Sequence, residues 1–232
     1  MGSSATGRAV RTLLAAVGDL AVPVLCGGCA RPGTPWCDGC ASTIRDVPRA
    51  LRPRVDPGVP AWAVGRYAGP LRGAVLELKE HGRRDLAPIL GDGLAAALMT
   101  LAEWGDLPSC RHLALVPAPT RTASARRRGG DPVTAVTSAA ATRLGSGAHV
   151  VPVLATAHLT RDSAGLGAGA RSSNLAGAIR LTRRPQAVMR SPHTLTVLVD
   201  DVLTTGATSA ASVRRLAQAG VRVRAVVVLA GA

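Results

Sequence analysis

Aromatic residues are almost absent from this chain of 232 residues. It contains no phenylalanine, one tyrosine and three tryptophans, so aromatic residues make up only 2% of the sequence. Proteins dedicated to binding single-stranded nucleic acid stack bases on aromatic side chains. The composition therefore argues against a module that does nothing but bind nucleic acid.

Long uninterrupted apolar runs are also lacking. Charged residues interrupt every candidate before it reaches the ~20 residues of a membrane-spanning helix, so we expect no membrane span. Near the N-terminus, basic residues precede LLAAV, as in a signal peptide, but no clean small-residue cleavage site follows. We predict an amphipathic helix there and a cytoplasmic protein.

Lysine is the third scarcity. Lys79 is the single lysine among 28 basic residues, and the rest are arginines, so any one arginine is weak evidence for a ligand. Their distribution says more, because residues 107–199 carry twelve arginines, two acids and thus a net charge of +10. The excess indicates a polyanionic ligand such as phosphate, pyrophosphate or nucleic acid. A solvated basic surface is the alternative for each arginine.

Cysteines, in contrast, are concentrated near the N-terminus. Four of the five form two CxxC pairs, CGGC and CDGC, at Cys26, Cys29, Cys37 and Cys40. Paired CxxC knuckles predict one structural Zn²⁺ with four thiolate ligands, and the glycines permit tight turns between the sulfurs. Two disulfides are the alternative, which we favour less because the rest of the chain has no secretory character.

The remaining sequence predicts an α/β fold. Residues 46–60 are rich in proline and arginine and lack apolar periodicity, which predicts a linker. Beyond them, predicted helices near 71–82, 94–104, 132–144 and 209–220 alternate with predicted strands at 112–117, 150–154, 194–199 and 221–229. Asp131 as N-cap with Pro132 predicts the start of the third helix and Gly145 its end, and Leu216 and Ala217 are expected to face inward in the fourth. The alternation indicates a parallel sheet flanked by helices. We divide the chain into an N-terminal helix with a zinc module (1–45), a linker (46–60) and an α/β domain (61–232).

The stretch VLVDDVLTTGATSA at 197–210 places two adjacent carboxylates, Asp200 and Asp201, where the predicted strand gives way to a loop. Burying neighbouring charges is costly unless something pairs with them. Small residues let a backbone approach phosphate, and the N-terminus of the following helix favours its charge. Since carboxylates accept hydrogen bonds from hydroxyls, the pattern predicts a site for a ribose 5-phosphate unit. An Asp N-cap before a threonine-rich turn is the alternative, which explains only one acid.

VLVDDVLTTGATS resembles the signature that binds 5-phosphoribosyl 1-pyrophosphate (PRPP) in type I phosphoribosyltransferases. Together with the paired CxxC knuckles, it resembles more narrowly the ComF/GntX family of phosphoribosyltransferase-like proteins. Weaker segments agree in order: RYAGPLRGAVLELKEHG at 66–82, LVPAP at 115–119 followed by RRRGG, and LTRDSAGLGAGARSSNLAGAI at 159–179. The resemblance implies a type I phosphoribosyltransferase-like sheet behind a small zinc-binding module.

The resemblance also implies roles for individual residues. Asp200 and Asp201 would hold the ribose hydroxyls, with Lys79 as an accessory contact. The 5-phosphate would be wrapped by Thr204, Thr205, Gly206, Ala207 and Thr208. The loop after the strand at 112–117 would meet pyrophosphate through Arg126, Arg127, Arg128 and Gly129. A mobile hood at 160–173 would carry Arg161 and Arg171, which makes Arg171, Asp200 and Asp201 the candidate catalytic residues.

Two segments depart from the family pattern. The chain has VPAP and RGGDP where the family usually has VPVP and RGFNQ, and AGLGAGA stands where a glutamine is expected in the hood. These differences weigh against transferase turnover more than against PRPP binding.

The function implied is PRPP binding with Mg²⁺, transfer of the phosphoribosyl group to an unidentified acceptor with release of pyrophosphate, and a link to competence and DNA uptake. Two alternatives stay open. One is a non-catalytic competence protein that handles single-stranded DNA; the other is a PRPP-responsive regulator that keeps the fold without the chemistry.

Overall fold

A six-stranded sheet forms the centre of the computed structural model, which describes residues 24–44, 47–119, 131–156 and 178–232. The strand order is β1-β2-β8-β7-β3-β4. All neighbours pair in parallel except β1, which runs antiparallel to β2 at one edge. The bounds are β1 (Arg49–Leu51), β2 (Ala61–Arg66), β3 (His112–Pro117), β4 (Ala148–Val150), β7 (Thr194–Leu203) and β8 (Val223–Gly231). The predicted α/β class and mostly parallel sheet are confirmed.

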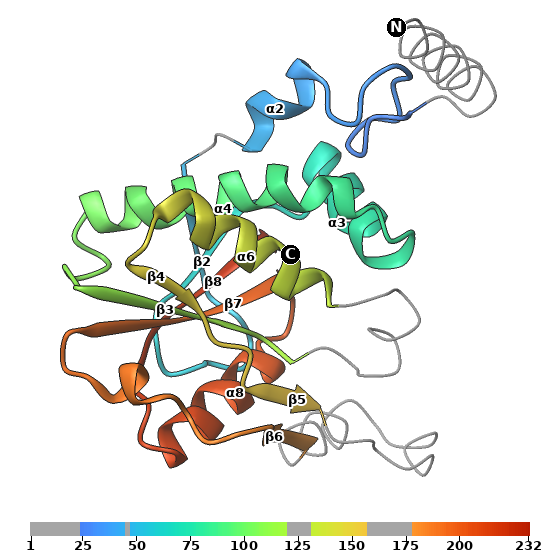
Figure 1. Cartoon of the computed structure of the whole chain (residues 1–232). Coiled ribbons are helices and arrows are strands. Elements are labelled where there is room, and N and C mark those ends of the chain that lie inside the picture. The colour runs from blue at the N-terminus through green and yellow to red at the C-terminus, as the bar shows by residue number, and fades with distance from the viewer. Residues whose placement is uncertain (1–23, 45–46, 120–130, 157–177) are drawn as a thin grey trace, which may run out of the picture.

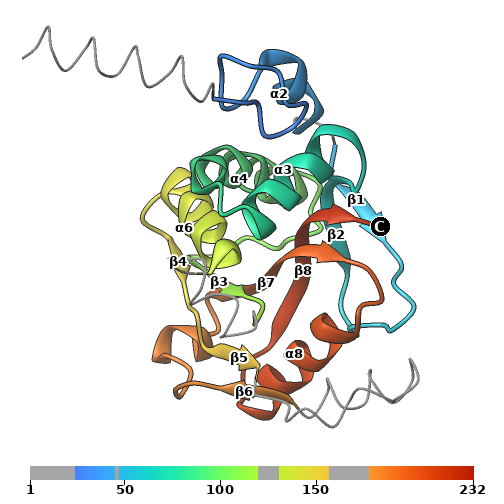
Figure 2. The same ribbon diagram turned by 90° about the vertical axis from the view of Figure 1, so that its right-hand side faces the viewer.

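Helices cover both faces of this sheet (Figures 1 and 2). One face carries α3 (Gly69–Glu80), α4 (Ala87–Glu103) and α6 (Pro132–Leu144), with the short α2 (Asp38–Ile44) above them. The other face carries α8 (Ala207–Gln218) and a separate antiparallel pair, β5 (Leu154–Thr156) and β6 (Ile179–Leu181). The 3₁₀ helices η1 (Arg84–Leu86) and η3 (Ala187–Arg190) complete the described elements.

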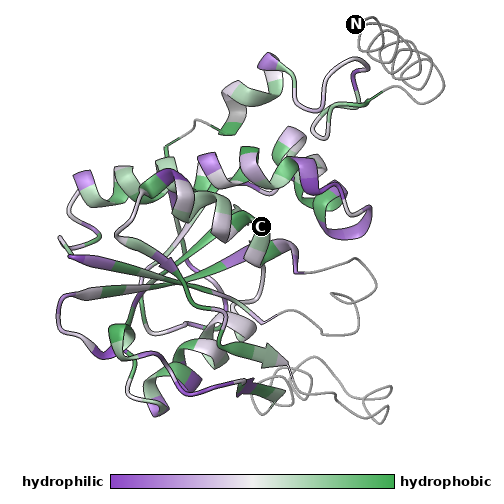
Figure 3. Cartoon of the chain, in the orientation of Figure 1, coloured by the Kyte–Doolittle hydropathy of each residue, from purple (hydrophilic) through white to green (hydrophobic). Residues whose placement is uncertain are grey.

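Each face of the sheet has its own apolar core. Leu94, Val136 and Val197 belong to the cluster beneath α3, α4 and α6, whereas Leu198 and Leu216 belong to the cluster beneath α8. The strands between the layers are accordingly hydrophobic along most of their length (Figure 3). Successive residues of β7 alternate between the two cores, as the pleat of a strand requires.

The predicted caps place α6 correctly. The Asp131 carboxylate accepts hydrogen bonds from the N–H groups of Val133 and Thr134, and Pro132 occupies the first turn, where its missing N–H costs nothing. The helix ends at Gly145, whose φ of 94° is readily available only to glycine. A local sequence pattern thus determines both ends of this helix.

Helix α4 begins earlier than predicted, at Ala87, because Pro88 fits its first turn and η1 leads directly into it. Together, Arg84–Glu103 form the one helical segment of the described residues that is long and apolar enough to cross a membrane. In this fold, 56% of its apolar window is buried, against α6 and the sheet among other elements. A core helix has this same composition, so the expected absence of a membrane span stays a prediction.

The strand predicted at 150–154 is wrong. Pro152 has no N–H to donate to a ladder, and the chain divides there into β4, at the edge of the main sheet, and β5, in the small sheet. In α8, Ala217 is exposed instead of facing inward as predicted, whereas Leu216 is buried.

The predicted linker is partly ordered structure. Its residues 49–51 form β1, which pairs with β2 and extends the main sheet. Further along, the Val55 N–H donates a hydrogen bond to the Thr205 carbonyl at 2.8 Å. This segment therefore contacts the loop that follows β7.

Candidate functional site

The four clustered cysteines meet at one point. Their sulfurs all lie within 4.8 Å of one another, and the Sγ atoms are 3.7 Å apart for Cys26 and Cys40 and 3.6 Å apart for Cys29 and Cys37. A disulfide has sulfurs ~2.05 Å apart, so these cysteines are free thiols. Four sulfurs bound tetrahedrally to zinc at ~2.3 Å would be ~3.8 Å apart. The cluster therefore fits a metal ion such as Zn²⁺.

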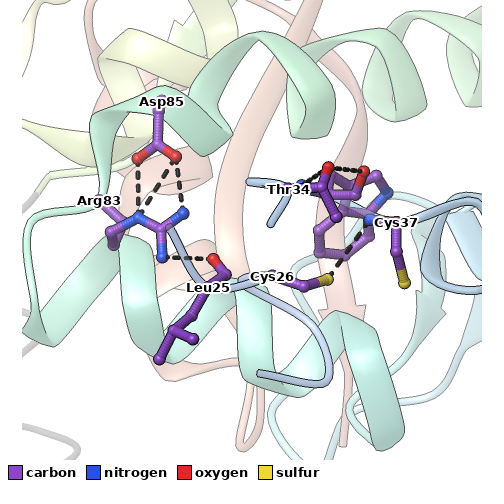
Figure 4. Close-up of polar contacts among 7 residues, drawn as sticks. Leu25, Cys26, Thr34, Cys37, Arg83 and Asp85 are labelled. Atoms are coloured by element: carbon purple, nitrogen blue, oxygen red, sulfur yellow. Dashed lines mark hydrogen bonds and ion pairs between the residues drawn. The ribbon is translucent and has the colours of Figure 1, made fainter. Parts of the chain in front are cut away.

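Backbone N–H groups prepare Cys26 to be a thiolate ligand. Burial opposes its charge, but N–H groups of Cys29, Cys37 and Gly28 outweigh that effect and lower the pKa of Cys26 to about 6. The Cys37 N–H donates directly to Cys26 Sγ (Figure 4). Since thiolates bind metals and thiols do not, the local backbone favours metal binding.

The cysteine module packs closely against the α/β domain. Arg83 binds Asp85 through two nitrogens and donates to the Leu25 carbonyl at 2.9 Å (Figure 4). A Cβ atom on Gly28 would lie 2.7 Å from Cys40 Sγ and 2.9 Å from Pro70 Cβ. Neither glycine of CGGC has a positive φ. Gly28 is thus explained by close packing rather than by the turn freedom that the sequence predicted.

The two aspartates lie on β7, beside the point where the chain reverses the direction in which it adds strands to the sheet. From β3 the chain moves outward to β4, and later returns to place β7 on the other side of β3. The helices that follow diverge, because α6 covers one face and α8 the other (Figure 1). In open parallel sheets, ligands bind at the carboxyl ends of strands at such a switch point.

Asp200 and Asp201 occur inside β7, not after it. The prediction that the strand gives way to a loop at Asp200 is wrong, because β7 continues to Leu203 alongside β8. Beside it, however, β3 ends at Pro117, which pairs with Val199. The aspartates therefore stand just beyond the end of β3, on the longer of the two adjacent strands.

Lys79 reaches this position from α3. Its Nζ lies 2.9 Å from Asp201 Oδ2, and the Asp201 side chain is only 10% exposed. Burial disfavours the lysine charge, but Asp201 outweighs burial and raises the pKa of Lys79. The single lysine and the second aspartate thus form an ion pair, and Asp201 is satisfied without a ligand.

Asp200 has a different environment. Burial, followed by the charge of Asp201, raises the pKa of Asp200 to about 8. Asp131, at the start of α6, contributes to this rise, whereas Lys79 and the Asp201 N–H, which donates to Asp200 Oδ1 at 2.8 Å, oppose it. The raised pKa favours the protonated form of Asp200, which both donates and accepts hydrogen bonds.

The loop after β7 is short and leads directly into α8, which starts at Ala207, two residues before the prediction. Thr204 and Thr205 are exposed, and the Thr205 hydroxyl accepts a hydrogen bond from the Ala207 N–H. Gly206 has a φ of 84° and is buried against Pro53 and the carbonyl oxygen of Val55. The exposed hydroxyls and the helix N-terminus can meet a phosphate, while one side of the loop is covered by the 53–55 segment.

Several predicted contacts lie outside the described residues: Arg126, Arg127, Arg128, Gly129, Arg161 and Arg171. The ends of the first of these segments are described. The Ala118 N–H bonds to the Val199 carbonyl at 2.7 Å, and Asp131 is close enough to influence Asp200. The segment 119–131 therefore leaves and re-enters the described structure beside the aspartates.

Sequence reasoning missed two neighbours of the site. It assigned Asp131 only a capping role, and nothing in its local pattern places it near Asp200. It also treated residues 53–55 as linker, although they pack on the loop after β7. Both contacts join segments far apart in the sequence, so no local signal indicates them.

No protein-family model matches the chain, and no curated protein matches its sequence.

Proposed function

We propose that this protein binds PRPP together with Mg²⁺ and belongs with the phosphoribosyltransferase-like proteins of the ComF/GntX type. The observation that carries the proposal is the pair Asp200 and Asp201 beside the end of β3, at the switch point of the sheet, directly before the loop that enters α8. That order of groups suits a sugar followed by its 5-phosphate.

The charge state of the pair supports a sugar ligand. With Asp201 paired to Lys79 and Asp200 largely protonated, the three groups together carry little net charge at neutral pH. A strongly negative pair would repel the phosphates of PRPP. A nearly neutral pair can instead bind two adjacent hydroxyls, since Asp200 offers a donor as well as an acceptor.

The loop after β7 supports the phosphate end of the ligand. Thr204, Thr205 and the N-terminus of α8 supply hydroxyl and N–H donors within a few residues of Asp201. Pyrophosphate would face the segment 119–131, whose described ends adjoin Asp200 and which carries three consecutive arginines.

In the proposed reaction, an acceptor nitrogen forms a bond to C1 of the ribose as the bond from C1 to the pyrophosphate oxygen breaks. Pyrophosphate leaves with the electron pair, and the nitrogen loses a proton. Mg²⁺ bound with the substrate would neutralise the departing charge. Asp200 and Asp201 hold the ribose hydroxyls, which keeps C1 in position between the acceptor and the pyrophosphate.

Calorimetric titration of PRPP with Mg²⁺ tests the proposal. We expect wild-type protein to bind about one PRPP per chain and the double variant Asp200→Asn with Asp201→Asn to lose binding. The matched control is Asp92→Asn, which removes one exposed carboxylate on α4. Circular dichroism would show whether each variant is folded, and unchanged affinity in the folded double variant would contradict the proposal.

Turnover is tested separately, by pyrophosphate release in the presence of purine and pyrimidine bases. Release with one base would identify a transferase and its acceptor. PRPP binding without release for any base would favour the regulator among the two alternatives.

A further inference from the structure

A cavity of about 520 Å³ lies at the amino ends of β3, β7 and β8, whereas the aspartates lie toward the carboxyl end of β7. Its walls come from the segment before β3, the turn between η3 and β7, and the start of β8. The volume is within the range of small-molecule sites. Thr194 and Asp200 are six residues apart along β7, or about 20 Å at the rise of a strand, so this cavity is separate from the site proposed above.

The lining of the cavity is strongly basic. Arg190, Arg222 and Arg224 contribute to it together with His193, and no acidic residue lines it. Among the described residues, none of these three arginines forms an ion pair. Three guanidinium groups remain charged at every physiological pH, so they repel one another until an anion lies among them.

Three separate segments of the fold bring these basic residues together. Arg222 directly precedes β8 and Arg224 is its second residue; both are exposed, and as alternate residues at the entry of a strand they share one face. Arg190 ends η3. The turn that carries His193 is tied to the segment before β3, because the His193 carbonyl accepts hydrogen bonds from the N–H groups of Arg111 and His112.

We propose that this cavity binds a small, multiply charged phosphate compound of nucleotide size. Arginines match phosphate oxygens in bidentate geometry, and their convergence on one hollow suits a compact ligand rather than an extended polymer. No Phe, Tyr or Trp side chain lines the cavity, so it has no row of rings on which successive bases could stack, which disfavours single-stranded nucleic acid.

Titration with inorganic tripolyphosphate, without added magnesium, tests this site. We expect one tripolyphosphate per chain and an affinity about tenfold or more weaker in the double variant Arg222→Gln with Arg224→Gln, since charge-assisted hydrogen bonds to phosphate are lost. The control is Arg180→Gln with Arg214→Gln, which removes the same charge from exposed positions outside the cavity.

Cys110 provides an independent readout of the location. It is exposed and lines the cavity, so bound tripolyphosphate should slow its modification by iodoacetamide in wild-type protein and not in the Arg222/Arg224 variant. Mass spectrometry of the labelled peptide separates Cys110 from the cysteine cluster.

Two results would overturn the proposal: equal tripolyphosphate affinity in the wild type and the Arg222/Arg224 variant, or binding of single-stranded oligodeoxythymidylate that depends on these arginines and resists competition by tripolyphosphate. The Asp200/Asp201 variant should bind tripolyphosphate without magnesium as the wild type does, and the Arg222/Arg224 variant should keep the magnesium-dependent PRPP binding that the Asp200/Asp201 variant loses. Failure of one site is therefore distinguishable from failure of the other.

Discussion

Two adjacent aspartates in β7, Asp200 and Asp201, differ from each other in their properties because different residues surround them. Asp201 is paired with Lys79 at 2.9 Å, whereas Asp200 is half-buried beside Asp201 and forms no ion pair among the described residues. Identical side chains one position apart therefore have different electrostatic environments. The difference arises because α3 supplies a cation to one of them and no described cation pairs with the other.

Asp200 should make the protein less stable as pH rises. Its pKa is about 8 in the folded protein and 3.8 without the fold, so between these values the folded state holds a proton that the unfolded state releases. Stability then falls with rising pH, by at most about 1.4 kcal/mol per pH unit. Asp200→Asn should flatten this dependence, measured by urea unfolding at about pH 5 and about pH 8.

Metal binding at the cysteines also depends on pH, but it contributes equally to the unfolding free energy of the variant and the wild type, so it cancels in their difference. Asp92→Asn, at an exposed position, should retain the wild-type slope. An Asp200→Asn variant with that same slope would show that Asp200 is ionised in the folded protein.

At the scale of elements, α4 and α6 approach each other through a glycine. Gly91 lies within α4, where glycine costs about 1 kcal/mol relative to alanine. A Cβ there would lie 2.5 Å from Ala139 Cβ, 2.9 Å from the Ala140 nitrogen and 3.0 Å from the Val136 oxygen. Two of these atoms belong to the backbone of α6, so a Cβ at position 91 could be accommodated only if α4 and α6 moved apart.

Gly91→Ala should therefore destabilise the fold by about 1–3 kcal/mol, despite the higher helix propensity of alanine. Urea unfolding gives this difference. Gly39→Ala in α2 is the matched control, because a Cβ there meets no atom within 4 Å, and it should be neutral or slightly stabilising. If Gly91→Ala also proved stabilising, the close approach of α4 to α6 would be wrong.

For the whole molecule, the cysteine module and the α/β domain form a continuous packed structure. Ile44, the last residue of α2, belongs to the core cluster beneath α3 and α4, and the module's glycines lie against Leu86 and Pro70. Loss of order in the module would expose apolar surface on the domain. A metal ion bound by the four cysteines would therefore stabilise more of the protein than its own loop.

Metal removal should lower the thermal stability of the whole protein. We expect about one zinc per chain by elemental analysis. Chelation or Cys26→Ser should lower Tm by several degrees, because without the cation the remaining thiolates would repel one another or become protonated. Cys110→Ser should retain both zinc and Tm, since Cys110 lies outside the cluster. Full stability without metal, or no bound metal, would contradict the prediction.

The sequence alone was sufficient where structure depends on neighbouring residues. The CxxC spacing predicted the cysteine cluster, Asp131 with Pro132 predicted the start of α6, and the apolar run from Thr194 predicted β7. Caps, knuckles and strand propensity act over a few residues, so each is visible in a short window of sequence.

Tertiary structure decided which distant segments meet. The order of strands placed Asp200 and Asp201 beside the end of β3, brought Lys79 and Asp131 to them, and converted part of a predicted linker into β1. It also assembled the arginine-lined cavity from three segments. Local sequence cannot reveal these contacts, because strand order and helix packing are set by burial of the two apolar cores across the whole chain.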